Sequence, residues 1–242
     1  MEASGTKLIM GLGNPGPAYA DNRHNVGFMA LDLFAREGLD GAGPPANFKS
    51  SLIVTGAGRS GRVILAWPQT YMNLSGHAAR ELVSFYKISA AEDLLVVHDE
   101  MDLPCGRVKA TRGGGSAGHN GIDSVKEAVP ADFARLRIGI GRPPKDLWGA
   151  SPGSRDYVLS PFEPEENPLV EEALKAAREL MAVWLKDGLS AAQRLGNRRP
   201  PKPKAKKGGE GEGKPGVQGE PDGQGQAEGG GKPGGQGQAG PG

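Results

Sequence analysis

The sequence predicts an α/β fold, in which a single globular domain has a mixed, mainly parallel twisted sheet flanked by helices. Short apolar runs typical of buried strands alternate with segments of helical periodicity. Turns rich in glycine and proline separate them. The segment 198–242 is almost entirely Gly, Pro, Gln, Lys and Glu, so it cannot bury enough apolar surface to offset its ordering entropy. We therefore expect a short extension at 1–6, a folded domain at 7–197 and a disordered tail at 198–242.

The first half of the domain is expected to start with a buried strand, because its first apolar run is short and closed by glycine. Apolar side chains then recur at helical spacing between Val26 and Phe34. Two β-rich runs flank a turn that contains Gly58 and Gly61, which predicts a hairpin. The expected elements are a strand at 7–12, a turn region at 11–22, a helix at 25–37, and hairpin strands at 48–55 and 62–67.

The second half repeats the alternation of helix and strand. Its helices are indicated by apolar periodicity, and Pro130 ends one of them. Its strands are short continuous apolar runs, which is typical of strands buried on both faces. The expected elements are a helix at 74–86, strands at 94–97, from 108 and at 136–140, a helix ending near 129, a loop at 141–156, and helices at 167–186 and 189–195.

Composition narrows the class of protein. The formal net charge is +1, so the whole chain has no strong electrostatic signature. A single cysteine, Cys105, excludes an intramolecular disulfide framework and a multi-cysteine zinc site. The N-terminus lacks a basic region and a long apolar run, so we expect a soluble cytoplasmic protein without membrane association. Basic residues cluster where domain and tail meet: Arg194, Arg198, Arg199, Lys202, Lys204, Lys206 and Lys207.

Two glycine motifs invite interpretations that their surroundings contradict. Residues 11–16 match the G-x-G-x-x-G dinucleotide fingerprint, but prolines and polar residues follow where a helix should open. Residues 114–118 match the G-x-S-x-G elbow of serine hydrolases around Ser116. Only His119 follows that serine, and no acid lies between the two, so the order of a hydrolase triad fails. The histidines and acids also fit no common metal-ligand spacing, and we expect no metal.

A different set of polar residues suits ester hydrolysis. In α/β sheets ligands bind at the carboxyl ends of strands, so the polar turns after the strands ending near Leu12, Trp67, Val97 and Lys109 could converge on one edge. A neutral histidine can activate water, a carboxylate can fix its tautomer, and amides can donate to an oxyanion. The candidates that supply these groups are Asn14, His24, Asn73, Asp99 and Asn120. Each also has a simpler structural interpretation; Asn73 and Asn120, for example, could be helix N-caps.

Five sequence blocks, in order from about Lys7 to Leu195, resemble the successive motifs of bacterial peptidyl-tRNA hydrolase. The blocks are KLIMGLGNPGPAYADNRHNVG, WPQTYMNLSG, LLVVHDEMDLPCG, GGGSAGHNG and FARLRIGIGRP. The resemblance covers the folded domain and excludes the tail. It implies a monomeric α/β hydrolase that cleaves the ester between peptide and tRNA in peptidyl-tRNA released prematurely from ribosomes. It implies neither a metal nor an organic cofactor.

The resemblance also assigns roles to residues. His24 would be the catalytic base and Asp99 its orienting partner. The other residues would bind the substrate near the scissile ester: Asn14, Tyr19, Tyr71, Met72, Asn73 and Asn120. The acceptor stem and 3′ end of the tRNA would be the parts bound.

One departure from the family concerns the pair of cations that holds the tRNA 5′-phosphate. Arg137 matches the arginine of that pair, but Thr111 stands at the position of the lysine. Arg112 is adjacent to it, although neighbouring strand residues point to opposite faces. Lys109, two residues back, shares the face of Thr111. The choice between Lys109 and Arg112 stays open at this level, and Cys105 in place of a usual proline is interpreted as neutral.

Two further hypotheses accompany this assignment. Relatives of the fold work as non-catalytic RNA-binding adaptors, although the intact set of candidate catalytic residues favours an enzyme. The tail, with its Lys202–Lys207 start, could make a weak, salt-sensitive RNA contact, and an inert solubilising segment is the simpler alternative.

Overall fold

The computed structural model describes residues 5–59, 61–143 and 153–197 and has a seven-stranded mixed sheet at its centre. The strand order is β2-β3-β4-β1-β5-β7-β6. The four central strands β4, β1, β5 and β7 are parallel, and the outer strands are antiparallel to their neighbours. The strands are β1 (Lys7–Gly11), β2 (Ala46–Phe48), β3 (Ser51–Gly58), β4 (Gly61–Pro68), β5 (Leu94–Glu100), β6 (Val108–Arg112) and β7 (Ala134–Gly139). The predicted fold class of a mixed, mainly parallel sheet is confirmed.

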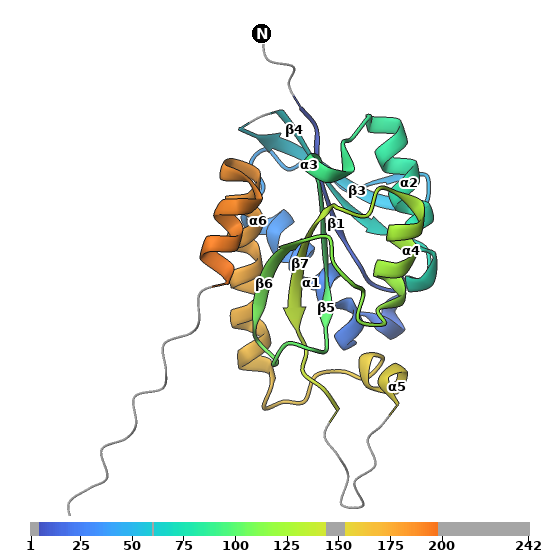
Figure 1. The fold of residues 1–242 in the computed structure, drawn as a ribbon, viewed down its shortest axis with the longest axis vertical. Coiled ribbons are helices and arrows are strands. Elements are labelled where there is room, and N and C mark those ends of the chain that lie inside the picture. Colours follow the sequence, from blue (N-terminus) through green and yellow to red (C-terminus); the bar gives the residue numbers. More distant parts are fainter. Residues whose placement is uncertain (1–4, 60, 144–152, 198–242) are drawn as a thin grey trace, which may run out of the picture. The chain divides into compact units, whose positions relative to one another are not determined.

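Helices cover both faces of the sheet (Figure 1). One face packs against α1 (Val26–Glu37) and α6 (Asn167–Gly196), and the other against α2 (Ser75–Tyr86) and α4 (Asn120–Ala128). Alternate residues of one strand serve the two faces: Ile9 belongs to the first core, while Leu8 and Met10 belong to the second. The central strands are therefore buried on both sides, which explains their continuous apolar sequence.

The expected elements are found, with shifts at their ends and some additions. Short elements that the sequence patterns did not indicate are β2, α3 (Ala90–Asp93), α5 (Ser154–Val158) and three 3₁₀ turns, η1 (Pro17–Tyr19), η2 (Arg23–Asn25) and η3 (Met72–Leu74). The two expected C-terminal helices form one element, α6, interrupted only by the non-helical backbone of Gly188 at φ 78°. The start of α5 falls within the expected loop 141–156, of which 144–152 lies outside the described residues, as does the expected tail.

The direction of β6 corrects one expectation about how the site is assembled. Because β6 is antiparallel to β7, its carboxyl end lies at the edge of the sheet opposite to the carboxyl ends of β1 and β5. Residues 113–119 then return along the sheet, and Arg135 donates to the carbonyl of Gly115 at 2.9 Å on the way. The glycine-rich segment thus reaches the common edge at His119, by this return and not by the end of a strand.

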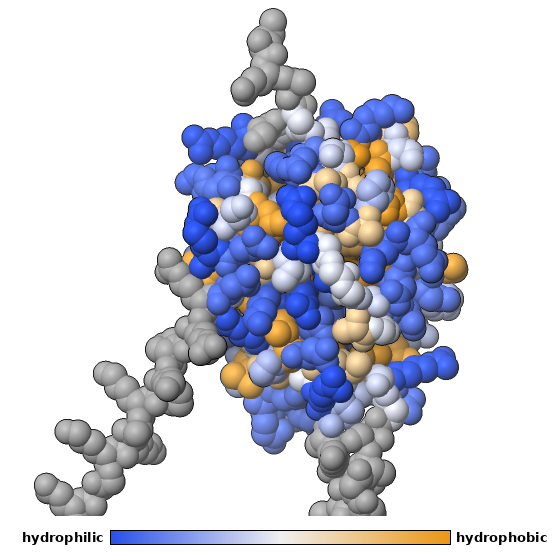
Figure 2. All heavy atoms as spheres, in the orientation of Figure 1, coloured by the Kyte–Doolittle hydropathy of each residue, from blue (hydrophilic) through white to orange (hydrophobic). Residues whose placement is uncertain are grey.

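The surface in Figure 2 is predominantly hydrophilic, with its apolar side chains in separate small patches. Among the described residues, no helix has the length and apolar character needed to cross a membrane.

Candidate active site

A cavity of about 700 Å³ lies beyond the carboxyl ends of β1 and β5. Its walls come from the turn after β1, the η3 turn, the end of β5, the start of α4 and the α5 helix. The residues that line it are Asn14, Tyr19, His24, Tyr71, Met72, Asn73, Asp99, Glu100, Met101, Ser116, Ala117, Gly118, His119, Asn120, Ser154, Arg155, Val158 and Leu159. Segments far apart in the sequence therefore meet at one edge of the sheet.

The position of His24 depends on a close approach of α1 to the sheet. Gly27 is the second residue of this helix, and a Cβ at that position would lie 2.5 Å from the carbonyl oxygen of Val97 and 2.6 Å from that of Leu12. Only glycine therefore fits without displacing the backbone. This contact sets the η2 turn, with His24 in it, directly against the end of β5, which carries Asp99.

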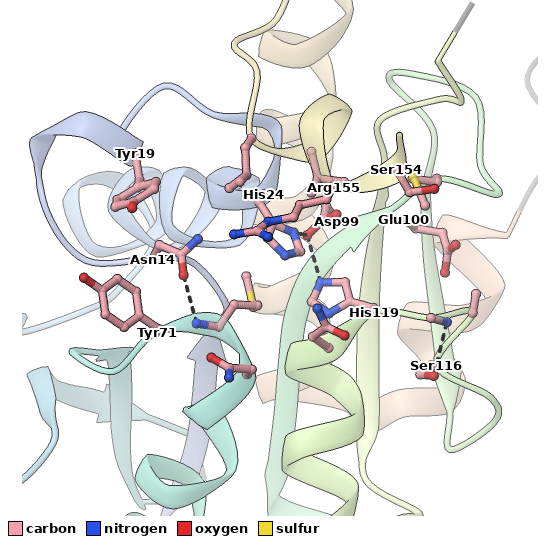
Figure 3. Close-up of a pocket in the computed structure, with 18 residues that line it drawn as sticks. Asn14, Tyr19, His24, Tyr71, Asp99, Glu100, Ser116, His119, Ser154 and Arg155 are labelled. Carbon is pink, nitrogen blue, oxygen red and sulfur yellow. Dashed lines mark hydrogen bonds and ion pairs between the residues drawn. The ribbon is translucent and has the colours of Figure 1, made fainter. Parts of the chain in front are cut away.

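His24, Asp99 and His119 form one hydrogen-bonded group (Figure 3). His24 Nδ1 lies 2.8 Å from Asp99 Oδ1, and His119 Nε2 lies 2.8 Å from the same oxygen. Asp99 is almost fully buried, and both imidazoles are largely buried beside it. A single carboxylate oxygen thus accepts from two histidines.

The tautomers follow from the other bonds of these rings. His119 Nδ1 accepts from the backbone N–H groups of Gly121 and Ile122 at 3.1 and 3.3 Å, so its proton is on Nε2, which donates to Asp99. His24 donates from Nδ1 to the ionised carboxylate, which leaves its Nε2 with a free lone pair in the neutral ring. An imidazole in this state can accept a proton at Nε2.

The charge of Asp99 is held in place by its surroundings. Burial alone would raise the pKa of Asp99, but His119 and His24 outweigh that effect through charge and hydrogen bonding, and the pKa is strongly lowered. Asp99 therefore remains ionised beside the imidazoles. Burial lowers the pKa of the neighbouring His98 well below its usual value, and His119 lowers it further, so that ring is neutral.

Asn14 presents an amide donor to the cavity. Its Oδ1 accepts from the backbone N–H of Met72 at 2.8 Å, so Nδ2 is the group left for a ligand. Asn25 holds the backbone of Asn14 at both its N–H and its carbonyl, at 2.9 and 3.0 Å. Tyr19 and Tyr71 lie on opposite sides of Asn14 in Figure 3.

The remaining sequence-predicted substrate residues also line the cavity. Asn73 and Asn120 are exposed on its wall, and Met72 is buried at its base. Neither asparagine is a helix N-cap. The cap of α4 is His119, whose side chain accepts the two backbone N–H groups, and the cap position of α2 is Leu74. The alternative interpretation of these asparagines as caps is therefore wrong.

The three tRNA-contact candidates lie outside the cavity lining, on β6 and β7. Arg137 pairs with Glu100, with its Nε 2.9 Å from Glu100 Oε2, and Lys109 is its direct cross-strand partner. Arg112 points to the other face and interacts with the carbonyls of Ala91 and Asp132. Lys109, and not Arg112, therefore shares the face of Arg137.

Besides Ser116 and Ser154, sequence patterns missed three polar residues of the cavity wall: Glu100, His119 and Arg155. His119 carried a usable signal, because it immediately precedes a helix within a glycine-rich loop. Glu100 gave none, because it is only the chain neighbour of Asp99, and Arg155 gave none, because it lies in a short helix that the sequence patterns did not indicate. Ser116 also lines the cavity, and its Oγ accepts from the N–H of Gly118 within its own loop at 3.3 Å.

The group could also be considered as metal ligands. His24, Asp99 and His119 offer three ligand atoms within 4.8 Å of one another. The same atoms are engaged with each other at 2.8 Å, which is the length of a hydrogen bond. Hydrogen bonding therefore explains the position of all three side chains.

These features define a single-domain α/β hydrolase with a histidine–carboxylate site at the carboxyl edge of its sheet. The family model described as peptidyl-tRNA hydrolase matches residues 8–206. The chain is 43% identical to the peptidyl-tRNA hydrolase of Solidesulfovibrio magneticus, over 77% of this chain and 90% of that protein. It is 46% identical to that of Desulfitobacterium hafniense, over 79% and 100%. A crystal structure of peptidyl-tRNA hydrolase from Acinetobacter baumannii aligns with a TM-score of 0.70 at 32% identity, over 81% of this chain and 97% of that one. The chain belongs to the peptidyl-tRNA hydrolase family.

Proposed function

We propose that this protein hydrolyses the ester that joins the peptide to the 3′-terminal ribose of tRNA, with His24 as general base. The observation that carries the proposal is the Asp99 carboxylate, which fixes the Nδ1 proton of His24 and leaves Nε2 as the free base. The substrate would be peptidyl-tRNA released prematurely from ribosomes, so that the reaction frees the peptide and recycles the tRNA.

The reaction needs no enzyme nucleophile. Nε2 of His24 removes a proton from water as the water oxygen attacks the ester carbonyl. The imidazolium that forms is stabilised by ionised Asp99, and the developing oxyanion accepts from Nδ2 of Asn14. Collapse of the tetrahedral intermediate breaks the bond to the ribose oxygen, which takes the proton back from His24. Asn73 and Asn120 hold the substrate on either side of this centre.

The tRNA would approach over β6 and β7. Lys109 and Arg137 face the same side and form a pair of cations for a terminal phosphate. Because Arg112 is engaged on the opposite face, it takes no part in this pair. Glu100 holds Arg137 in position while tRNA is absent. We further propose that the protein acts as a monomer in the cytoplasm, and that its tail adds at most a weak contact to RNA.

The proposal is tested by single-turnover hydrolysis of a defined N-acetyl-aminoacyl-tRNA. We expect His24→Ala to lower the rate by about 10²–10⁴-fold, as removal of a general base does, while tRNA binding is retained. His77→Ala is the matched control, since His77 is an exposed histidine on α2 outside the cavity. Near-wild-type turnover by His24→Ala would refute the mechanism.

The same assay separates the rival functions. Binding of structured RNA by the wild type without any turnover would favour a non-catalytic adaptor. Loss of activity on treatment with a serine-directed covalent inhibitor, and in Ser116→Ala, would favour a serine esterase. We expect neither result.

A further inference from the structure

One charged side chain of the active-site cavity takes no part in the reaction proposed for it. Arg155 lines the cavity from α5, and among the described lining residues it alone has the positive charge of an arginine or lysine. Within the described part of the chain, no residue accepts a hydrogen bond from its guanidinium or forms an ion pair with it. The N–H donors of this side chain are therefore available to a ligand in the cavity.

The helix that carries Arg155 is fixed to the turn that carries His24. The guanidinium carbon of Arg23, the residue before His24, lies 4.4 Å from the ring centroid of Tyr157 on α5. The backbone N–H of Arg23 also donates to the carbonyl of Ser160 at 3.0 Å, just after α5. Arg155 thus extends into the cavity from a backbone whose place beside His24 is set by these contacts (Figure 3).

The other charges of the cavity wall are negative. Asp99 is buried, and because its pKa is strongly lowered it stays ionised. Glu100 also lines the cavity, and its charge is offset by Arg137, whose Nε lies 2.9 Å from Glu100 Oε2. An anionic group that enters the cavity would be repelled by Asp99 unless a cation compensates for that charge. Arg155 is the described lining residue that can supply this compensation.

The expected path of the tRNA 3′ end brings an anionic group to this place. The proposed phosphate contact, Arg137, lies on β7, and His24 follows β1, while the order of these strands in the sheet is β1-β5-β7. The 3′ end must therefore cross the end of β5, where Asp99 and Glu100 lie. The last nucleotide bears the ester on its ribose and is joined to the rest of the tRNA by one phosphodiester.

We propose that Arg155 binds the phosphodiester of the 3′-terminal nucleotide and so places the esterified ribose against His24. A guanidinium suits this role because its planar fork donates two parallel N–H bonds to phosphate oxygens. This inference rests on the proposed function and adds a specificity-determining residue to it. The site then selects esters of a nucleotide with a charged 5′ side over esters of a neutral nucleoside.

The test uses two minimal substrates with the same N-acetyl-aminoacyl ester on the ribose of adenosine. One carries a 5′-(methyl phosphate), which has the single charge of an internal phosphodiester, and the other carries a neutral 5′-(dimethyl phosphate). We expect kcat/KM of the wild type to be about 10-fold higher for the charged substrate, the effect of one hydrogen bond to a charged group. Arg155→Met should abolish this preference, and Arg155→Lys should keep part of it.

A matched control makes the same substitution outside the cavity. Arg178→Met changes an arginine of α6 whose Nη1 lies 3.0 Å from Glu37 Oε2, and it should keep the preference for the charged substrate. An equal loss of activity on both substrates in Arg155→Met would overturn the inference, because a merely structural role affects both alike. Equal rates of the wild type on both substrates, or an unchanged preference in Arg155→Met, would also overturn it.

Binding of unreactive ligands distinguishes this inference from the proposed function. Adenosine 5′-(methyl phosphate) without an ester should bind the wild type about 10-fold more tightly than Arg155→Met in a nuclear magnetic resonance titration. N-acetylglycine, which has the carboxylate of a released peptide, should bind both proteins equally. Binding of the phosphate ligand that depends on Arg155, without turnover of either substrate, would refute the proposed function and support the role of Arg155. Turnover together with an Arg155-dependent binding of N-acetylglycine alone would refute the phosphodiester contact.

Discussion

At the scale of single residues, His119 shows how one imidazole can connect the start of a helix to a buried carboxylate. Its Nδ1 satisfies two N–H groups at the start of α4, and its Nε2 therefore carries the proton that is donated to Asp99. The helix cap thus fixes a tautomer, and the tautomer helps to keep Asp99 ionised. The ionised carboxylate in turn orients His24, which donates to the same oxygen.

Replacement of Asp99 by asparagine should be severe although it changes few atoms. The neutral amide no longer stabilises an imidazolium, even where its Oδ1 takes the place of the shared carboxylate oxygen and accepts from both histidines. We expect kcat to fall about 10²–10⁴-fold, the range found when the orienting acid of a histidine base is lost. The rate is measured on N-acetyl-aminoacyl-tRNA, with thermal unfolding and tRNA affinity as controls. A loss of less than about threefold would contradict this role.

His98 should make stability depend on pH. Burial holds its folded-state pKa well below the unfolded value of about 6.5, so below that pH only the unfolded chain takes up the proton. The free energy of unfolding should therefore fall by up to about 1.4 kcal/mol per pH unit between pH 6.5 and 5 from this group. Asp99 adds no slope there, since its lowered pKa contributes stability that is lost only below about pH 4.

Urea unfolding at pH 5, 6 and 7 checks this expectation. His98→Asn should unfold with a flatter dependence on pH, whatever its stability at neutral pH. His77→Asn, at an exposed position, should keep the wild-type slope. An equal dependence of the unfolding free energy on pH in the wild type and His98→Asn would show that His98 does not cause this dependence.

At the scale of elements, the site depends on how closely helices approach the sheet and each other. Gly27 lets α1 touch the ends of β1 and β5. Gly76 does the same between α2 and α4, where an added Cβ would lie 2.0 Å from the carbonyl oxygen of Ser124. These two contacts set the starts of α1, α2 and α4 around the active-site cavity.

Gly27→Ala should separate His24 from Asp99. The new Cβ meets two backbone carbonyls, which cannot turn away as a side chain would, so α1 must shift. We expect a loss of about 1–3 kcal/mol of stability, typical of overpacking, together with a clear loss of kcat. Gly5→Ala is the control, because nothing lies within 4 Å of its added Cβ. Stability is compared by urea unfolding and activity by turnover. Equal stability and equal kcat for Gly27→Ala and Gly5→Ala would contradict a close approach of α1 to the sheet.

At the scale of the whole molecule, a buried arginine joins the turn that holds His24 to the C-terminal part of the domain. Arg23 precedes His24 and forms a bidentate pair with Glu166 at 2.9 and 2.5 Å. Its guanidinium also lies over the rings of Tyr157 and Phe162, at 4.4 and 4.9 Å from their centroids. Tyr157 is part of α5, so the helix that closes one side of the cavity is fixed to the turn that carries His24.

Removal of the tail tests whether the described domain is sufficient. Truncation after Arg199 should leave kcat and thermal stability unchanged, because the described cores use no residue beyond this point. If Lys202, Lys204, Lys206 and Lys207 contact RNA, KM of the truncated protein should rise at low salt and match the wild type at high salt. An unchanged KM at low salt would refute the RNA contact. A fall in thermal stability would contradict the independence of the domain.

The sequence by itself was enough to predict the α/β class, most of the elements, and the residues that line the cavity after β1, β4 and β5. These features are local or follow from which strand ends share an edge. The tertiary structure alone decided the partners of Asp99, because His24 lies 75 positions from it and His119 lies 20 positions away, distances that no periodicity connects. It also decided the direction of β6 and its register with β7. As a result Lys109, and not Arg112, lies on the same face of the sheet as Arg137. Pairing between strands and packing between helices are interactions through space, and they fix which side chains meet.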